Sequence, residues 1–517
     1  MLLYAETHYP RFGPSRIRKS EPELAADVPW RVEPGTGIPV LLVVKDAHWY
    51  PVFLERLTLI VEDAGTGSDV ATIEHVLNER VTSIWWWHLV EIPSLPSGTY
   101  RVSPVLTYRC GDAWHSVVAD NYRGTSHRPF TVSVGGERWP IPEGWQAGDV
   151  HTHTEYTRDQ VEFGPPLPAI AAMSRSMGVR WVALTDHSYD LDDSEQDYLV
   201  NAPELPRWKA FLRGCSEPHE EVCLIPGEEV SCGNRKGRNV HLLGLGLSQY
   251  IPGKGDSAER PTRTRPDLAV PEVIRRIRDQ DGLAIAAHPG HRSPLAERII
   301  FRRGTWEWDD LTEPGLGGMQ FWNGPRDRGF ERGLEAWVRL LLSGRRMVGL
   351  AGNDSHGAFG RSRRVRLPWV SLADDERHLF GRVRTVVGTE KGTPQAVLAA
   401  LAEGRCYLTD GPALTLEVAT AAGRFPLGST APVPVMRAII AASSTSDWGA
   451  IERVGLAVGI IGERGERWTW QGVSGDLFSV TWEPAIDVKQ AAYVRAEVRT
   501  KDGACAFTNP IWISGAR

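Results

Sequence analysis

The amino-acid sequence predicts an α/β domain in the middle of the chain, with a β-domain on each side of it. Short segments rich in β-branched and aromatic residues fill residues 1–136, and similar segments return over residues 412–517. Between them, apolar strand-like segments alternate with helical ones. Such alternation is typical of a parallel sheet with crossover helices, which can close into a barrel. We therefore expect domains over residues 1–140, 141–411 and 412–517.

The first domain is predicted to be a β-sandwich. Its segments PVLLVV, RLTLIVED, TSIWWWHLVEI and RPFTVSV are separated by Gly, Pro and Asp, and regularly spaced short strands are typical of sandwiches. Side chains alternate along a strand, so Trp85 and Trp87 share one face and Trp86 the other. Because aromatic rings must hide a large area, we expect packing rather than an exposed binding platform.

The middle domain has helix signals at four places, in PLPAIAAMSRSMG, PELPRWKAFLRGC, PEVIRRIRDQDG and ERGLEAWVRLLLSG. Strand signals precede or follow each of them, for example in VRWVALTDH and LAIAAHPGH. In the last domain ALTLEVAT, RVGLAVGII and AAYVRAEVRT predict a second β-sandwich-like unit.

Composition and charge exclude several classes of protein. The 517 residues carry 58 Lys and Arg against 64 Asp and Glu, a formal net charge of −6, which argues against nucleic acid as the partner. The segment MLLYAETHYPRFGPSR lacks the apolar run of a signal peptide, and no run is long enough to span a bilayer. The cysteines form no CxxC pair. We expect a cytoplasmic protein with free thiols and a small-molecule partner, and the oligomeric state stays open.

Residues that bind metals follow one predicted strand after another in the middle domain. A lone histidine on a strand is more often structural than a ligand, but six of them at successive strand ends, joined by acids, indicate a site, because the carboxyl ends of parallel strands meet in one crevice. Imidazole and carboxylate together suit Zn, Mn or Fe. They outnumber the ligands of one ion, which predicts two or three ions and a bridging carboxylate. The candidates are His151, His153, His187, Glu229, His241, His288, Asp354 and His356.

In this order the motifs HTH, TDH, GEE, HLLG, AHP and NDSH resemble the PHP (polymerase and histidinol phosphatase) superfamily of metal-dependent hydrolases. EGRCYLTDGP and the closing YVRAEVRTKDGACAFTNPIWI are similar to the CehA/McbA-type members of that superfamily, which carry β-domains around the barrel. The resemblance implies a distorted (β/α)7 barrel flanked by N-terminal and C-terminal β-sandwich-like domains, with a two- or three-metal centre.

The resemblance also implies how the ligands are shared. Glu229 is preferred to Glu228 because the family pattern has its acid two residues after the glycine, here Gly227. The commonest first motif is HxHTxxSDG, and Arg158 stands where its aspartate would be, so Asp159 is assigned in its place. The implied ligand sets are His151, His153, Glu229 and Asp354 for the first ion, Glu229, His241 and His288 for the second, and Asp159, His187 and His356 for the third.

Further residues are expected to support the site. Asp149 and Asp186 can orient ligand imidazoles by accepting their second N–H. Asn323 contacts substrate or turns the chain. Guanidinium groups match phosphate, so arginines in the loops after the late strands bind an anionic substrate, or else form a solvated surface. These arginines are Arg326, Arg328, Arg361 and Arg363.

The predicted function is metal-dependent hydrolysis, with the attacking water held by the ions beside Glu229, Asp354 and His356. Phosphoesters are the favoured substrates; carbamates, esters or amides are the alternative, and a binding or scaffold protein with a relic barrel is the non-enzyme alternative. Converging arginines favour phosphate, whereas an apolar pocket favours neutral esters. The tryptophans that can line such a pocket are Trp208, Trp306, Trp308 and Trp322. Amidohydrolases also begin with HxH, but they need a strand-end lysine, and Lys236 and Lys254 lie in predicted loops.

Overall fold

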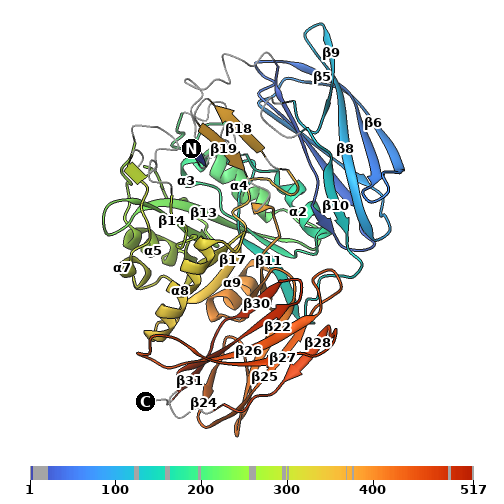
Figure 1. The fold of residues 1–517 in the computed structure, drawn as a ribbon. Coiled ribbons are helices and arrows are strands. Elements are labelled where there is room, and N and C mark those ends of the chain that lie inside the picture. The colour runs from blue at the N-terminus through green and yellow to red at the C-terminus, as the bar shows by residue number, and fades with distance from the viewer. Residues whose placement is uncertain are drawn as a thin grey trace.

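The computed structural model carries side chains and shows three regions that follow one another along the chain (Figure 1). The residues that the structure describes are 2–3, 21–121, 127–157, 163–195, 200–255, 263–293, 298–299, 302–361, 363–367, 370–374, 378–486 and 491–514.

The N-terminal region consists of two sheets that enclose an apolar core containing Leu24, Val40, Leu57 and Val132. Trp86 packs against this core, whereas Trp85 and Trp87 pack against the core of the middle region, as the alternation of side chains predicts. The first sheet is β2 (Glu23–Asp27), β4 (Ile38–Lys45) and β7 (Trp85–Ile92). The second is β3 (Arg31–Val32), β10 (Phe130–Val134), β8 (Gly98–Cys110), β5 (Val52–Asp63) and β6 (Asp69–Val81), with β9 (Ala113–Val118) paired to β8.

The middle region contributes seven strands to one large sheet. In spatial order these are β17 (Val348–Gly352), β16 (Gly318–Asn323), β15 (Leu283–Ala286), β14 (Asn239–Leu245), β13 (Cys223–Gly233), β12 (Trp181–Leu184) and β11 (Trp145–Thr152). The sheet curls, so that the ends of β11 and β17 meet: the Asp354 N–H donates to the His151 carbonyl at 3.0 Å, and the His153 N–H to the Ser355 carbonyl at 2.9 Å. The curl brings the first and the last ligand motifs together.

Helices form at the four segments that the sequence predicted as helical and, among the described residues, at three further segments. Proline at the first turn starts α2 and α4, and the Asp327 carboxylate caps α8 by accepting the Gly329 N–H at 2.7 Å. The helices are α2 (Leu167–Ser176), α3 (Ser188–Leu191), α4 (Pro206–Ser216), α5 (Val270–Arg278), α7 (Trp308–Leu311), α8 (Arg328–Leu342) and α9 (Pro394–Glu403).

The predicted distorted (β/α)7 barrel is wrong. The described part of the chain is mostly β, with 43% of its residues in strands and 15% in helices. The strands of the middle region belong to a 15-stranded sheet that continues from β11 through β20 into the C-terminal region. Within it, β13–β14 and β14–β15 pair antiparallel. The physical reason is the turn between β13 and β14: the Asn234 side chain accepts the N–H groups of Lys236 and Arg238, both at 2.9 Å, and reverses the chain without a crossover helix.

The C-terminal region extends the same sheet and adds a second one. Its core, which includes Leu414, Ile440, Val454 and Val498, lies between the two sheets. The extension is β20 (Arg384–Gly388), β21 (Cys406–Thr409), β30 (Cys505–Thr508), β29 (Tyr493–Thr500), β26 (Ile451–Gly459) and β27 (Arg467–Gly472), with β31 (Ile511–Ser514) and β24 (Thr430–Pro432) beside it. The second sheet is β23 (Gly423–Pro426), β22 (Ala413–Thr420), β25 (Val435–Ser443) and β28 (Ser479–Trp482).

A separate small sheet joins β1 (Leu2–Leu3) to β19 (Val370–Asp374) and β18 (Arg363–Leu367). Over the part of the chain that is described, no helix has both the length and the apolar character that crossing a membrane requires. All six cysteines are free thiols.

Candidate metal centre

Eight histidine and acidic side chains, which lie within the strands of the curled sheet or just after them, come together. They form three groups, in each of which the ligand atoms lie within 4.8 Å of one another. The two histidines of HTH lie at the end of β11 and just after it, His187 follows β12, and His288 follows β15. The groups are His151, His153, Glu229 and Asp354; Glu229, His241 and His288; and His153, His187 and His356.

The first group surrounds one carboxylate oxygen from each of two acids. The Nε2 atom of His151 lies 3.4 Å from Oε2 of Glu229 and 3.2 Å from Oδ1 of Asp354. The Nε2 atom of His153 lies 3.4 Å and 3.3 Å from the same two oxygens. Two imidazoles and two carboxylates around one point form the four-ligand set that a divalent transition metal takes.

The second group uses the other oxygen of Glu229. The Nδ1 atom of His241 lies 2.8 Å from Oε1 of Glu229, and Nε2 of His288 lies 3.2 Å from it. Each oxygen of this carboxylate therefore faces a different group. The neighbouring Glu228 is engaged elsewhere, since its carboxylate accepts from the Ser188 hydroxyl and from the Ile251 N–H. The structure thus places Glu229 at the centre of the site.

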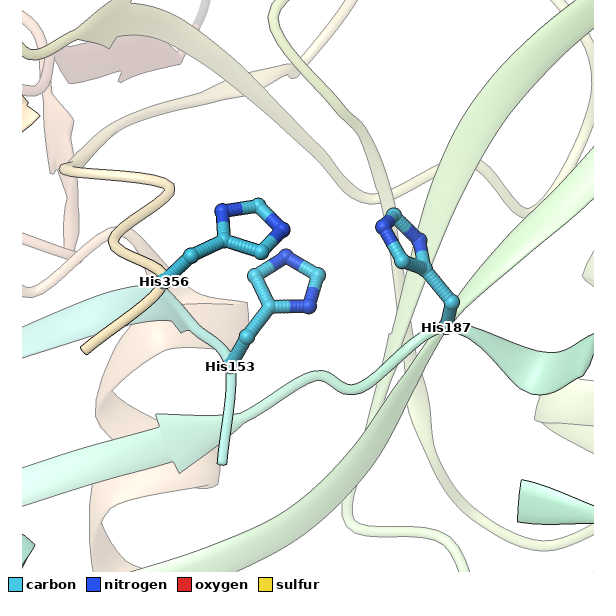
Figure 2. Close-up of side chains that lie close together, drawn as sticks. All are labelled: His153, His187 and His356. Atoms are coloured by element: carbon cyan, nitrogen blue, oxygen red, sulfur yellow. The ribbon is translucent and has the colours of Figure 1, made fainter. Parts of the chain in front are cut away.

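The third group consists of three imidazoles that approach one another from two sides (Figure 2). His153 and His356 stack with ring centroids 3.8 Å apart, and His187 lies across from them at 4.5 Å from His153. The Nε2 atom of His153 already faces the first group, and its Nδ1 lies 3.1 Å from the Thr157 hydroxyl. His153 therefore belongs to both the first and the third group, whereas His187 and His356 belong to the third group alone. Asp159, the acid assigned to it from the sequence, lies outside the described residues.

The buried atoms of the site fit a cation. Within the described chain, Nε2 of His151, His153 and His187 and Oε2 of Glu229 are shielded from solvent and form no hydrogen bond. Each such atom costs free energy when it is buried without a partner. Divalent ions bound by these nitrogen and oxygen donors would satisfy all of them, and the donor set suits Zn, Mn or Fe.

The electrostatics of the site keep the acids ionised. Burial alone would raise the pKa of Glu229, but His241 and His151 hold it well below its usual value. Burial would also raise the pKa of Asp354, but His151 and His153 hold it well below the usual value. For His153 burial opposes protonation, but Asp354 and Glu229 raise its pKa to about 10. The carboxylates are therefore ionised and paired with imidazoles, and a divalent cation would take the place of the imidazole protons.

The backbone is strained at two of the ligands. His288 has φ 29° and Asp354 has φ 53°, both in the left-handed region that side chains other than glycine seldom adopt. Such conformations persist where the surrounding structure holds them, and they cluster at functional sites. The strain supports a functional rather than a purely structural role for these strand ends.

The residues that orient the imidazoles differ from those predicted. Asp149 accepts the backbone N–H of His151 at 3.0 Å, and Asp186 accepts from the backbone and hydroxyl of Thr154. Both acids therefore fix the chain around HTH rather than an imidazole, which corrects the role assigned to them. Instead, Nδ1 of His151 lies 2.8 Å from Oε1 of Gln320. Gln320 lies inside a strand and in no motif, so sequence reasoning had no signal for it.

The candidate ligands His241, His288 and Asp354 line a pocket, and three of the four predicted arginines do not line it. Arg326 forms an ion pair with Asp410 at 3.2 Å and reaches the C-terminal region, Arg328 is exposed at the start of α8, and Arg361 is buried over the Phe163 ring. The Arg363 side chain lies outside the described part of the structure. Asn323 does line the pocket, and its amide donates to Oδ2 of Asp354 at 3.2 Å. A different arginine, Arg303, lines the pocket.

One of the four predicted tryptophans also lines this pocket, namely Trp306. Trp208 and Trp322 are buried in the core, and Trp308 lies under the guanidinium of Arg339 at 4.2 Å. Arg303, which lies in the same segment FRRGTWEW, belongs to none of the motifs considered, so sequence reasoning had no signal for it.

Comparison with known proteins leaves the family open. No family model matches the sequence, and no curated protein matches it. Among solved structures, a β-glucuronidase from Bacteroides uniformis is 10% identical, with 95% of this chain and 60% of that chain covered and a TM-score of 0.18. A β-glucuronidase from Parabacteroides merdae is 10% identical over 96% and 64% of the two chains, with a TM-score of 0.19. The chain thus spans less than two thirds of these neighbours' length, and likeness of this degree says nothing about activity.

Proposed function

We propose that the protein is a metal-dependent hydrolase with a two- or three-metal centre. The observation that carries the proposal is the position of Glu229: its two oxygens face two different groups of ligands. Divalent ions held by these residues would activate water near neutral pH and would stabilise the charge that develops on the substrate. Asp354 completes the first group and His356 the third, so both would lie beside the attacking water.

The residues of the chain keep this centre ready for chemistry. Glu229 and Asp354 stay ionised, so they hold cations without first losing a proton. In hydrolysis the oxygen of water bonds to the phosphorus or carbonyl carbon, the bond to the leaving oxygen breaks, and a proton moves from the water to the departing group. The order of the motifs HTH, TDH, GEE, HLLG, AHP and NDSH, which resemble the PHP superfamily, supports this reaction class.

Phosphoesters are the substrates we favour, because Arg303 lines the pocket beside the ligands. Carbamates, carboxyl esters or amides are the second candidate, as the CehA/McbA-type resemblance of the C-terminal segments implies. Trp306 in the same pocket favours that candidate, since an aromatic wall suits a neutral, flat leaving group. A scaffold protein with a relic site would be expected to lose ligands, whereas the eight residues here lie together.

Metal content tests the proposal directly. Gently purified protein should hold two or three equivalents of Zn, Mn or Fe per chain by elemental analysis. Chelation should abolish the hydrolysis of aryl phosphates or aryl esters, and one of the three ions should restore it. Chelation should also lower the melting temperature, because an ion that binds the folded state alone stabilises it. Absence of bound metal together with chelator-resistant turnover would contradict the proposal.

A further inference from the structure

A buried hydroxyl links one imidazole of the first metal group to a carboxylate behind it. The Nδ1 atom of His153 lies 3.1 Å from the hydroxyl oxygen of Thr157, and this hydroxyl donates to Oδ1 of Asp186 at 2.9 Å. None of the three residues is more than 1% exposed. The connection between Asp186 and the imidazole of His153 therefore runs through Thr157.

The chain turns back on itself to bring Thr157 to the ring. The backbone N–H of Thr157 donates to the Thr154 carbonyl at 2.9 Å and also faces Oδ1 of Asp186 at 2.9 Å. The turn spans residues 154–157, so a side chain four positions after His153 returns to that histidine. Because Asp186 follows β12, the turn is tied to the neighbouring strand of the sheet.

The hydrogen bonds of Asp186 determine the direction of the Thr157 hydroxyl. Asp186 accepts the backbone N–H and the hydroxyl of Thr154, each at 2.8 Å, and the backbone N–H and the hydroxyl of Thr157. A hydroxyl has a single proton, and that of Thr157 is directed to Asp186. Its oxygen is then an acceptor for His153, which assigns a proton to Nδ1 of the imidazole.

The other nitrogen of this imidazole faces the first metal group. Nε2 of His153 lies 3.4 Å from Oε2 of Glu229 and 3.3 Å from Oδ1 of Asp354. A histidine that binds a metal through one nitrogen usually donates its second N–H to a fixed acceptor, which sets the tautomer and the orientation of the ring. The Thr157 hydroxyl has the position of such an acceptor.

We infer that Thr157 is a positioning residue of the metal centre. It holds the His153 imidazole in the tautomer and orientation that present Nε2 to the first group, and Asp186 fixes the hydroxyl that does so. The inference rests on the metal centre of the proposed function and adds to it a residue that acts through His153.

Two substitutions at one position test the inference. Thr157→Val removes the hydroxyl and keeps the shape of the side chain, whereas Thr157→Ser keeps the hydroxyl. In competition with a chromophoric chelator, the Val variant should bind Zn²⁺ about 10–100-fold more weakly than the wild type, and the Ser variant should stay within about threefold of it. Unchanged affinity in the Val variant would overturn the inference.

Thr154→Val is the matched control. The Thr154 hydroxyl donates to the other oxygen of Asp186, so this variant loses a buried hydrogen bond to the same carboxylate while the acceptor of His153 is kept. Its Zn²⁺ affinity should stay within about threefold of the wild type. Equal losses in Thr154→Val and Thr157→Val would show that Thr157 acts on the turn alone, and would also overturn the inference.

The result separates this inference from the proposed hydrolysis. Weaker Zn²⁺ binding in Thr157→Val, with recovery in Thr157→Ser, upholds the positioning role even if wild-type protein hydrolyses neither aryl phosphates nor aryl esters; that outcome counts against the proposed function alone. Thr157→Ala takes the place of the Val variant, with the same expectation, if circular dichroism shows that the Val variant does not fold.

Discussion

The Nδ1 atom of His241 lies 2.8 Å from Oε1 of Glu229. The opposite oxygen of the same carboxylate is the one that His151 and His153 approach, each at 3.4 Å. Glu229 is 1% exposed and comes from the central part of β13, so its position is set by pairing with β12 and β14 rather than by a loop. A carboxylate that is fixed on a strand, with each oxygen facing a different group of ligands, is well suited to hold two ions at a constant separation.

Glu229→Gln should remove most of the activity and leave the fold intact. Glutamine keeps the volume of the side chain but replaces one charged oxygen with an NH₂ donor, which faces nitrogen ligands and repels a cation. We expect turnover to fall more than about 100-fold, since even residues that only support a metal ligand contribute 10–100-fold. Metal content should fall by at least one equivalent per chain in elemental analysis, with an unchanged circular dichroism spectrum.

Glu228→Gln is the matched control for that variant. Glu228 is equally buried, but it hydrogen-bonds Ser188 and Ile251, and burial raises its pKa to about 8, so its neutral form already exists near neutral pH. This variant should keep its metal and most of its turnover. Near-wild-type turnover in Glu229→Gln, or equal losses in both variants, would contradict a bridging role for Glu229.

Gln320→Leu should weaken metal binding because it removes the hydrogen bond that orients the His151 imidazole. The amide oxygen of Gln320 lies 2.8 Å from Nδ1 of His151, which assigns the proton to Nδ1 and leaves Nε2 to face Glu229 and Asp354. Loss of this acceptor should reduce metal affinity about 10–100-fold. Competition with a chromophoric chelator measures the change. Gln320→Glu keeps an acceptor of the same size and should retain affinity; a Leu variant that binds metal like the wild type would rule out the orienting role.

Much of the candidate site could be predicted from the sequence because strand geometry is local. His151 and His153 lie two residues apart, so a strand presents both imidazoles on one side, and they do meet Glu229. The four longest helical patterns also become helices, because their spacing of apolar residues is a property of the segment itself.

The parts that could not be predicted depend on one local turn and on contacts between distant segments. The prediction of a barrel was wrong at the turn around Asn234. There the Asn234 side chain accepts the N–H groups of Lys236 and Arg238, and the chain reverses without a crossover helix. Arg303 reaches the pocket through its pairing with Asn239, 64 positions earlier in the chain, and no periodicity marks such a pairing. The partner of the His151 imidazole is Gln320 rather than Asp149, because Asp149 is held by the backbone of His151 and by Asn353.

A buried acid at the junction of the N-terminal and middle regions gives the protein a pH-dependent stability. The carboxylate of Asp27, in β2, accepts the backbone N–H groups of Phe359, Gly360 and Arg361, each at 2.9 Å. Burial raises its pKa from 3.8 to about 6, although Arg361 and these donors act in the opposite direction. The folded protein therefore binds a proton at Asp27 more tightly than the unfolded chain does, over the range between those two values.

The stability that Asp27 contributes should be fully present below about pH 4 and should be lost as the pH rises through about 6. A shift of this size corresponds to a free energy of unfolding on the order of 3 kcal/mol. Asp27→Asn cannot ionise, so the difference in free energy of unfolding between wild type and variant should move in favour of the wild type as the pH falls from about 7 to about 4. Urea unfolding of both metal-free proteins across that range measures the difference, and metal removal keeps ligand titration out of the comparison. A difference that stays constant with pH would show that Asp27 has the same pKa in the folded and unfolded chains.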